Sequence, residues 1–222
     1  MNEILEKIAV CVERGKINAQ SPYPPDMKGQ DGAYELTKKA LEEGVNPQDI
    51  LNNGLMVGMG HIGVKFRDNK IFVPDVLIAA KAMKSAMELL KPFFQSGQVK
   101  HKGSIILGTV TGDLHDIGKN IVSMVIEGGG WNVIDLGVDA GADKFLNAIK
   151  EHKVNAVGLS ALLTTTMQNM ENITKKIKEV HPEVKVLVGG APLTNDFANK
   201  IGADLYSPDP QGALDYLNVA FA

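Results

Sequence analysis

The sequence predicts an α/β protein in which an N-terminal four-helix bundle precedes a doubly wound parallel sheet of five strands. In the first part of the chain, apolar residues recur at helical spacing and the connections are short. In the second part, short apolar runs alternate with amphipathic helical patterns. A polar, glycine-bearing stretch from Gln95 to Gly103 separates the two and is typical of a linker. We therefore expect a helical-bundle domain over residues 1–97 and an α/β domain over residues 98–222.

The composition excludes several classes of protein. The formal net charge of the 222 residues is −3, and the lysines and arginines are scattered, so nucleic acid is not an expected partner. Cys11 is the single cysteine, which excludes a disulfide or zinc framework within the chain, and we expect it in the core. No apolar stretch reaches the roughly 20 residues that span a bilayer. The first residues, Met1-Asn2-Glu3, lack a signal-peptide pattern, so a cytoplasmic protein is expected.

Start and stop signals define the four helices of the first domain. The first two apolar patterns end at glycines, and the third begins at an asparagine followed by a proline suited to the first helical turn. The fourth opens at a valine-proline pair and is closed by Pro92. These signals predict helices over residues 4–14, 33–43, 47–66 and 73–90.

The third predicted helix has an unusual glycine content. Glycines occupy positions 54, 58, 60 and 63, and each costs about 1 kcal/mol relative to alanine inside a helix. Two explanations stay open: the close approach of a flat ligand, or tight packing against another helix. His61 in the same helix is expected to be a hydrogen-bonded surface or core group. Phe66 and Val73, which flank the turn that follows, fit ordinary core packing.

The second domain alternates strands and helices in the manner of a Rossmann-like, flavodoxin-like sheet. Nearly continuous apolar strands fit a parallel sheet that helices cover on both faces. Strands are predicted over residues 104–110, 131–136, 155–159, 184–188 and 204–206. Helices are predicted over residues 119–127, 142–152, 166–180, 194–200 and 211–219.

The loop after the first predicted strand is where we expect a ligand to bind, because open α/β sheets bind ligands at the carboxyl ends of their strands. The sequence there is T-V-T-G-D-L-H-D-I-G-K-N-I, residues 109–121. Asp113 and His115 can meet, and a metal-ligating histidine usually donates its second ring N–H to a carboxylate. Gly118 would let a bulky planar ligand pass close to the backbone. The alternative is that His115 is a polar loop residue and Asp113 caps the following helix.

Two further strand ends share this edge of the predicted sheet. Ser160 and Thr166 offer hydroxyl groups, either to a ligand or as helix caps. Gly189 and Gly190 offer either a floor without side chains for a flat group or a plain tight turn. The first loop lacks G-x-G-x-x-G spacing, so a nicotinamide cofactor is not expected.

Together, Asp113-x-His115-x-x-Gly118, Ser160-x-Leu162 and Gly189-Gly190 resemble the signature of cobalamin-binding domains. The whole chain resembles the corrinoid proteins of three-component methyltransferase systems, and it is similar to the cobalamin module of methionine synthase. The resemblance covers nearly all residues, including the helical domain, which would act as a cap.

The resemblance implies a role for each matching residue. His115 would replace the benzimidazole base of cobalamin as the lower axial ligand of cobalt, in the base-off, His-on state. Asp113 would hydrogen-bond His115, and the hydroxyl of Thr166, at the position of a serine in methionine synthase, would extend this relay. Phe66 and Val73 would cover the upper, methyl-bearing face. The implied cofactor-binding residues are Gly112, Asp113, Leu114, His115, Asp116, Ile117, Gly118, Ser160, Leu162, Thr164, Gly189, Gly190, Ala191, Met59, Phe66 and Val73.

The same resemblance implies a methyl carrier, not a complete enzyme. Cob(I)alamin would take a methyl group from a donor, and methyl-cobalt(III) would pass it to an acceptor. The implied partners are a substrate:corrinoid methyltransferase, a corrinoid:tetrahydrofolate or thiol methyltransferase, and a reductive activase. A methylamine, a betaine, methanol or a methoxy-aromatic compound could be the donor. The alternatives are the cobalamin-binding subunit of an adenosylcobalamin mutase, a cobalamin-dependent sensor, or a flavodoxin-like domain for another ligand.

Overall fold

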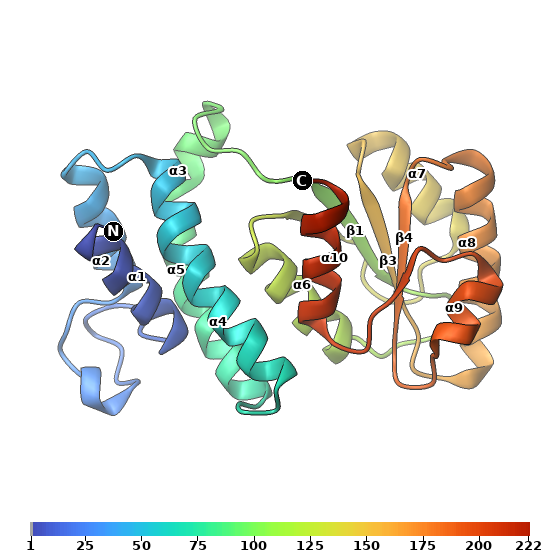
Figure 1. Cartoon of the computed structure of the whole chain (residues 1–222), viewed down its shortest axis with the longest axis horizontal. Helices are drawn as coiled ribbons and strands as arrows, with labels where there is room; N and C mark the ends of the chain where they lie inside the picture. The colour runs from blue at the N-terminus through green and yellow to red at the C-terminus, as the bar shows by residue number, and fades with distance from the viewer. Residues whose placement is uncertain (1) are drawn as a thin grey trace. The chain divides into compact units, whose positions relative to one another are not determined.

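The computed structural model of the chain describes residues 2–222 and consists of two compact units (Figure 1). The first unit comprises the chain up to His101 together with Gly128–Gly130. The second comprises Lys102–Glu127 and Trp131–Ala222. Among the described residues, no helix has the length and apolar character required to cross a bilayer.

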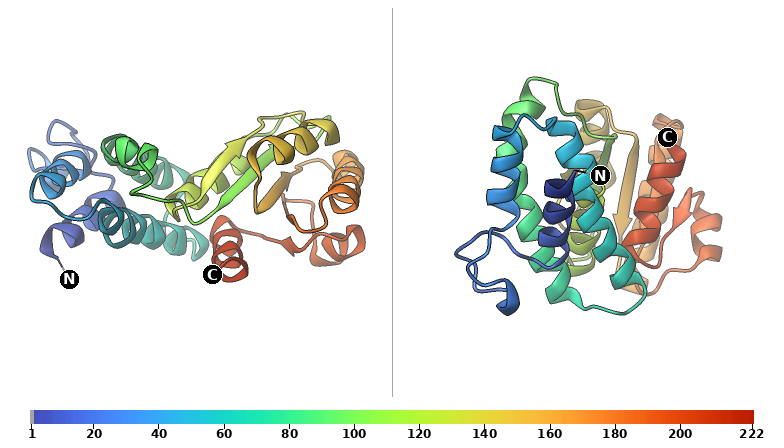
Figure 2. Two further views of the ribbon diagram at one scale, coloured as in Figure 1. Left: turned by 90° about the horizontal axis from the view of Figure 1, so that it is seen from above. Right: turned by 60° about the vertical axis from the view of Figure 1, so that its left-hand side comes forward.

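The first unit is a bundle whose helices pack side by side (Figure 2). Apolar faces form its core, and Cys11 is buried there as a free thiol, as expected. Burial raises the pKa of this thiol to about 11, so it is protonated at neutral pH. The bundle contains α1(Glu3–Glu13), η1(Pro25–Met27), α2(Ala33–Glu42), α3(Pro47–Ile50), η2(Leu51–Leu55), α4(Met56–Arg67) and α5(Val73–Gln95).

Two details of the bundle differ from the prediction. The third predicted helix is not uniform, because the π-helical segment η2 joins α3 to α4. The prediction that Pro92 closes the fourth helix near Leu90 was wrong, because α5 continues to Gln95. A proline removes one helical hydrogen bond and crowds the preceding turn. Here that cost falls near the end of a helix that buries an apolar face along most of its length.

The glycines at positions 54 and 58 bring the third helix close to α1. A Cβ atom on Gly58 would lie 2.4 Å from the carbonyl oxygen of Ala9 and 2.7 Å from the Cβ of Val12. A Cβ on Gly54 would lie 3.1 Å from a methyl group of Ile8. Tight helix packing therefore explains these two positions. Gly60 has no neighbouring atom within 4 Å of the added Cβ.

We expect Gly58→Ala and Gly60→Ala to change stability in opposite directions. The methyl group added at position 58 would displace the backbone of α1. The free energy of unfolding of Gly58→Ala should therefore be about 1–3 kcal/mol lower than that of the wild type. The methyl group on Gly60 meets open space, so the gain in helix propensity should raise stability by up to about 1 kcal/mol. Urea unfolding followed by circular dichroism measures both. Equal effects of the two substitutions would contradict the packing explanation.

The second unit is a five-stranded parallel sheet in the order β2-β1-β3-β4-β5. Helices α7, α8 and α9 cover one face and α6 and α10 cover the other (Figure 1). Each element lies within a few residues of its predicted range. The strands are β1(Ser104–Thr109), β2(Asn132–Asp135), β3(Ala156–Ser160), β4(Lys185–Gly189) and β5(Leu205–Tyr206). The helices are α6(Ile117–Gly128), α7(Ala142–His152), η3(Thr164–Thr166), α8(Met167–Val180), α9(Asn195–Ile201) and α10(Pro210–Ala220).

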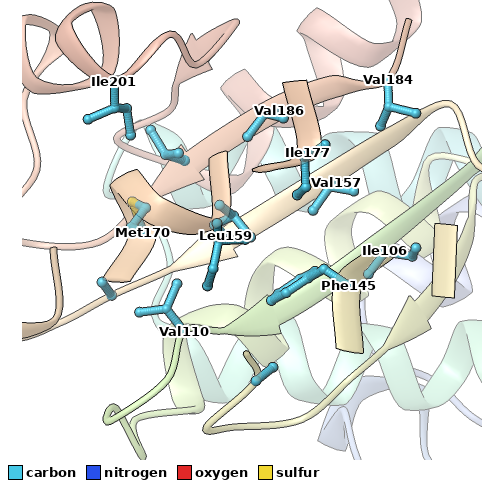
Figure 3. Packing of buried hydrophobic residues seen from close by; sticks show 14 of the residues in the cluster. Ile106, Val110, Phe145, Val157, Leu159, Met170, Ile177, Val184, Val186 and Ile201 are labelled. Carbon is cyan, nitrogen blue, oxygen red and sulfur yellow. The ribbon is translucent and has the colours of Figure 1, made fainter. Parts of the chain in front are cut away.

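A closely packed apolar core holds β1 and β3 in place (Figure 3). Phe145 of α7 lies against this core, and Gly108 of β1 makes room for it, since a Cβ there would lie 2.6 Å from the ring. Met170 of α8 packs against the same cluster, which includes Val157 and Leu159 of β3. This packing therefore fixes the position of the carboxyl ends of β1 and β3, where the predicted site lies.

Candidate functional site

In the loop between β1 and α6, the side chains of Asp113 and His115 contact each other. Nδ1 of His115 lies 2.7 Å from Oδ1 of Asp113, and the backbone N–H of His115 donates to the same oxygen over 3.1 Å. The Asp113 side chain is fully buried, whereas that of His115 is 51% exposed. An ionised carboxylate accepts the Nδ1–H, which leaves the lone pair on Nε2. No residue in the described range 2–222 hydrogen-bonds this Nε2, so it can serve as a metal ligand.

The second carboxylate oxygen of Asp113 binds the loop that follows β3. Oδ2 accepts the backbone N–H groups of Leu162 and Leu163 over 2.7 and 3.2 Å. It also lies 2.9 Å from the hydroxyl of Thr166, which is itself buried. The alternative interpretation of Asp113 and Thr166 as helix caps is wrong. Asp113 precedes α6 by several residues, and Thr166 makes no side-chain capping bond to α8.

Hydrogen bonds lower the pKa of Asp113 despite its burial. Burial alone raises the pKa of a carboxyl group. Here the N–H of Leu162, both N–H groups of His115 and the hydroxyl of Thr166 outweigh burial and hold the pKa well below its usual range. Asp113 is therefore a carboxylate at neutral pH and keeps the Nδ1 proton on His115.

Two glycines at the carboxyl end of β4, Gly189 and Gly190, have different structural roles. Thr109, Ser160 and Gly189 lie side by side in the register of β1, β3 and β4. Gly190 has a φ of +138°, and a Cβ on it would lie 1.8 Å from the carbonyl oxygen of Ala161. Only glycine fits there, because the chain passes directly over the end of β3. A Cβ on Gly189 would make an ordinary contact at 3.5 Å.

The loops after β1 and β3 expose large apolar side chains, which suits a large, flat, mainly apolar ligand. Leu114 and Ile117 are 73% and 70% exposed, and Leu162 and Leu163 are 43% and 41% exposed. A Cβ on Gly118 would have no neighbour within 4 Å. An exposed apolar cluster beside a histidine with a free ring nitrogen fits a corrin ring with its cobalt. Of the other predicted residues, Gly112, Asp116 and Thr164 are exposed after β1 and β3, Ala191 is exposed after β4, and Ser160 is half-buried.

The remaining predicted residues belong to the helical unit. Met59 in α4 is buried in the bundle. Phe66 at the end of α4 and Val73 at the start of α5 are half-buried and flank the turn between these helices. Their position over a cofactor stays a prediction.

One pair near the site was not predicted. Lys119, with a side chain only 3% exposed, contacts both carboxylate oxygens of Asp135 at 2.6 and 2.7 Å. Asp135 also accepts the N–H of Gly137. The pair joins the first turn of α6 to the end of β2. Its sequence signal is the lysine itself, because a cation in the first turn of a helix is unfavourable without an acidic partner.

The chain matches known protein families over most of its length. Residues 103–214 match the family model of the B12 binding domain, and residues 30–91 match a second B12 binding domain model. Trimethylamine corrinoid protein 2 of Methanosarcina mazei is 41% identical over 192 residues, covering 85% of this chain and 88% of that protein. Dimethylamine corrinoid protein 3 of Methanosarcina acetivorans is 42% identical over 187 residues, covering 83% and 87%. The chain belongs to the corrinoid proteins of methyltransferase systems.

This corrinoid protein also matches solved structures along almost its whole length. A chain of the methanol:cobalamin methyltransferase complex MtaBC from Methanosarcina barkeri superposes with a TM-score of 0.83 at 29% identity, covering 99% of this chain and 80% of that chain. The monomethylamine corrinoid protein of the same organism is 32% identical with a TM-score of 0.51, and 98% of each chain is covered. The fold class and the family predicted from the three motifs are therefore confirmed.

Proposed function

We propose that this corrinoid protein is a methyl carrier that holds its corrinoid through Nε2 of His115. The observation that carries the proposal is the buried carboxylate of Asp113, which fixes the tautomer and orientation of the imidazole and leaves Nε2 available. A bound corrinoid would supply a cobalt centre able to accept a methyl group from one partner and release it to another. The chain's own residues hold and shield that centre.

Asp113 and Thr166 would support the imidazole as it gains and loses the metal. The carboxylate strengthens the histidine as a ligand by accepting its Nδ1–H. The Thr166 hydroxyl lies 2.9 Å from the other carboxylate oxygen and 2.9 Å from the carbonyl oxygen of Leu163, and when it donates to the carboxylate it helps to keep Asp113 in place and ionised. This relay supports base-off, His-on binding, in which the cofactor's own base is not the ligand.

The rest of the edge would accommodate the body and the nucleotide tail of the cofactor. Leu114 and Ile117 offer apolar surface to a macrocycle. Ser160, Leu162, Gly189, Gly190 and Ala191 would line the path of the tail. Phe66 and Val73 would cover the methyl-bearing face from the helical unit, which would exclude water. The polar linker near Gly97, which has a φ of +77°, would let this unit move aside for each partner.

The names of the relatives favour a methylamine as the methyl donor. Trimethylamine and dimethylamine corrinoid proteins are about 40% identical to this chain, whereas the chain from the methanol complex is 29% identical. The partners we propose are a methylamine:corrinoid methyltransferase, a second methyltransferase with a thiol or tetrahydrofolate acceptor, and a reductive activase. The relatives reported above are named as corrinoid proteins, which favours the carrier over the mutase and sensor alternatives.

His115→Ala should abolish axial ligation by the protein. The purified chain loaded with cobalamin is reduced to the cobalt(II) form, and its electron paramagnetic resonance spectrum is recorded. Made with histidine labelled with the heavy nitrogen isotope, the wild type should show the two-line splitting of a labelled axial nitrogen. The variant should lose the two-line splitting, any three-line splitting then coming from the cofactor's own base, and it should bind cobalamin at least about tenfold more weakly.

The matched control is His152→Ala. His152 is the last residue of α7 in the same unit, and its side chain is 40% exposed. This variant should keep both the splitting and the affinity. Two-line splitting that persists in labelled His115→Ala would overturn the ligand assignment.

A further inference from the structure

Thr109 ties the backbone of His115 to the end of β1. Its side chain is fully buried, and its hydroxyl donates to the carbonyl oxygen of His115 over 2.9 Å. Both backbone groups of Thr109 are held by the segment after β2: its N–H donates to Gly137 and its carbonyl accepts from Ala140, each over 2.9 Å. On its other side it pairs with Ser160 of β3. The Thr109 hydroxyl therefore has a fixed position, and its hydrogen bond restrains the backbone of His115 in the loop after β1.

Asp139 holds the other end of the same loop. Its carboxylate accepts the backbone N–H of Gly112 over 2.8 Å, and its own N–H donates to the carbonyl of Asp113 over 3.1 Å. It does so with a φ of +51°, a left-handed conformation that non-glycine residues rarely adopt. Asn69 and Lys153 share this conformation elsewhere in the chain, so the two hydrogen bonds of Asp139 are what mark it out.

We propose that Thr109 and Asp139 are positioning residues for the Asp113–His115 pair. Neither side chain contacts the imidazole. Thr109 fixes the main chain of His115, and Asp139 fixes the main chain of Gly112 and Asp113. Together they set the geometry in which the carboxylate reaches Nδ1. Ligand sites need their supporting residues locked in this way, because small displacements weaken metal ligation. The inference rests on the proposed role of His115 as the cobalt ligand.

Thr109→Val tests the hydroxyl with little change in shape. In the cofactor-free chain, hydrogen exchange of a peptide covering residues 112–118 should become about tenfold faster, because one hydrogen bond is lost. In the cobalamin-loaded cobalt(II) form, the axial nitrogen splitting should become heterogeneous. Thr109→Ser keeps the hydroxyl and should restore both readouts.

Thr174→Val is the matched control. Thr174 is a fully buried threonine of the same unit, and its hydroxyl has no hydrogen-bond partner within residues 2–222. Its replacement should leave exchange at residues 112–118 and the splitting unchanged. Thermal unfolding of all three variants separates a local effect from general destabilisation.

Asp139→Ala tests the second contact in a residue that is exposed, so the variant should fold. It should accelerate exchange of the Gly112 amide and broaden the splitting, whereas Asp139→Asn, which keeps a side-chain oxygen, should do so less. Asp143→Ala, an exposed aspartate in the first turn of α7, should change neither.

The outcomes separate this inference from the proposed function. If the wild type itself shows no nitrogen splitting, the ligand role of His115 fails. If the wild type shows it and both Thr109→Val and Asp139→Ala keep the wild-type exchange and spectrum, the positioning role fails alone.

Discussion

Asp113→Ala should lower the free energy of unfolding by about 3–5 kcal/mol, the range seen when one partner of a buried charged network is removed. The carboxylate is fully buried and accepts from Leu162, Leu163, Thr166 and His115. Alanine would leave the backbone N–H groups of Leu162 and Leu163 and the buried hydroxyl of Thr166 without this acceptor. Chemical denaturation at neutral pH measures the loss.

The pH dependence of this stability loss shows whether the ionised carboxylate of Asp113 is responsible for it. The folded-state pKa of Asp113 is depressed, so its stabilising contribution is present above the unfolded value of about 3.9 and is lost as pH falls further. The difference in stability between wild type and Asp113→Ala should therefore narrow below about pH 4. Asp116→Asn, an exposed aspartate of the same loop, should cost at most about 0.5 kcal/mol. A constant difference between pH 7 and pH 3 would contradict the carboxylate network.

Gly190→Ala should also lower the free energy of unfolding by roughly 3–5 kcal/mol, because it introduces both a steric clash and backbone strain. The added Cβ would lie 1.8 Å from the carbonyl oxygen of Ala161, so one backbone segment must move. The φ of +138° is also outside the range that alanine adopts without strain. The movement would displace the loop after β3, which donates to Asp113, so binding of cobalamin should weaken as well.

Gly189→Ala is the internal control for this prediction. The neighbouring glycine has no positive φ, and its added Cβ would make an ordinary contact 3.5 Å from the carbonyl of Ser207. Gly189→Ala should lower the free energy of unfolding by less than about 1 kcal/mol. Thermal unfolding of both variants makes the comparison. Equal stability of the two variants would mean that the chain does not need the close crossing at Gly190.

Local patterns were sufficient to predict most of the fold. Apolar periodicity placed the five strands and their helices, because each element buries one stripe or face. Local patterns failed where tertiary packing overrides propensity. The buried face of α5 carries the helix past Pro92, and the packing of Gly54 and Gly58 on α1 accompanies a π-helical segment that no sequence rule predicts.

Some residues of the candidate site could likewise be predicted from the sequence and others could not. Asp113 and His115 could be predicted because they are close in sequence and their chemistry is complementary. The contacts of Thr109 and Asp139 are to backbone groups, which every residue carries, so sequence spacing holds no signal for them. Lys119 and Asp135 are brought together only by the packing of α6 on the sheet.

The central claim is that the ring nitrogen of His115 binds the cobalt of a corrinoid. The most direct measurement is the cobalt(II) electron paramagnetic resonance spectrum of the cobalamin-loaded chain, made once with ordinary histidine and once with histidine labelled with the heavy nitrogen isotope. We expect each line to split into three with ordinary histidine and into two with the labelled form. Splitting that labelled histidine leaves unchanged would show that the cofactor's own base is the ligand, and would contradict the account.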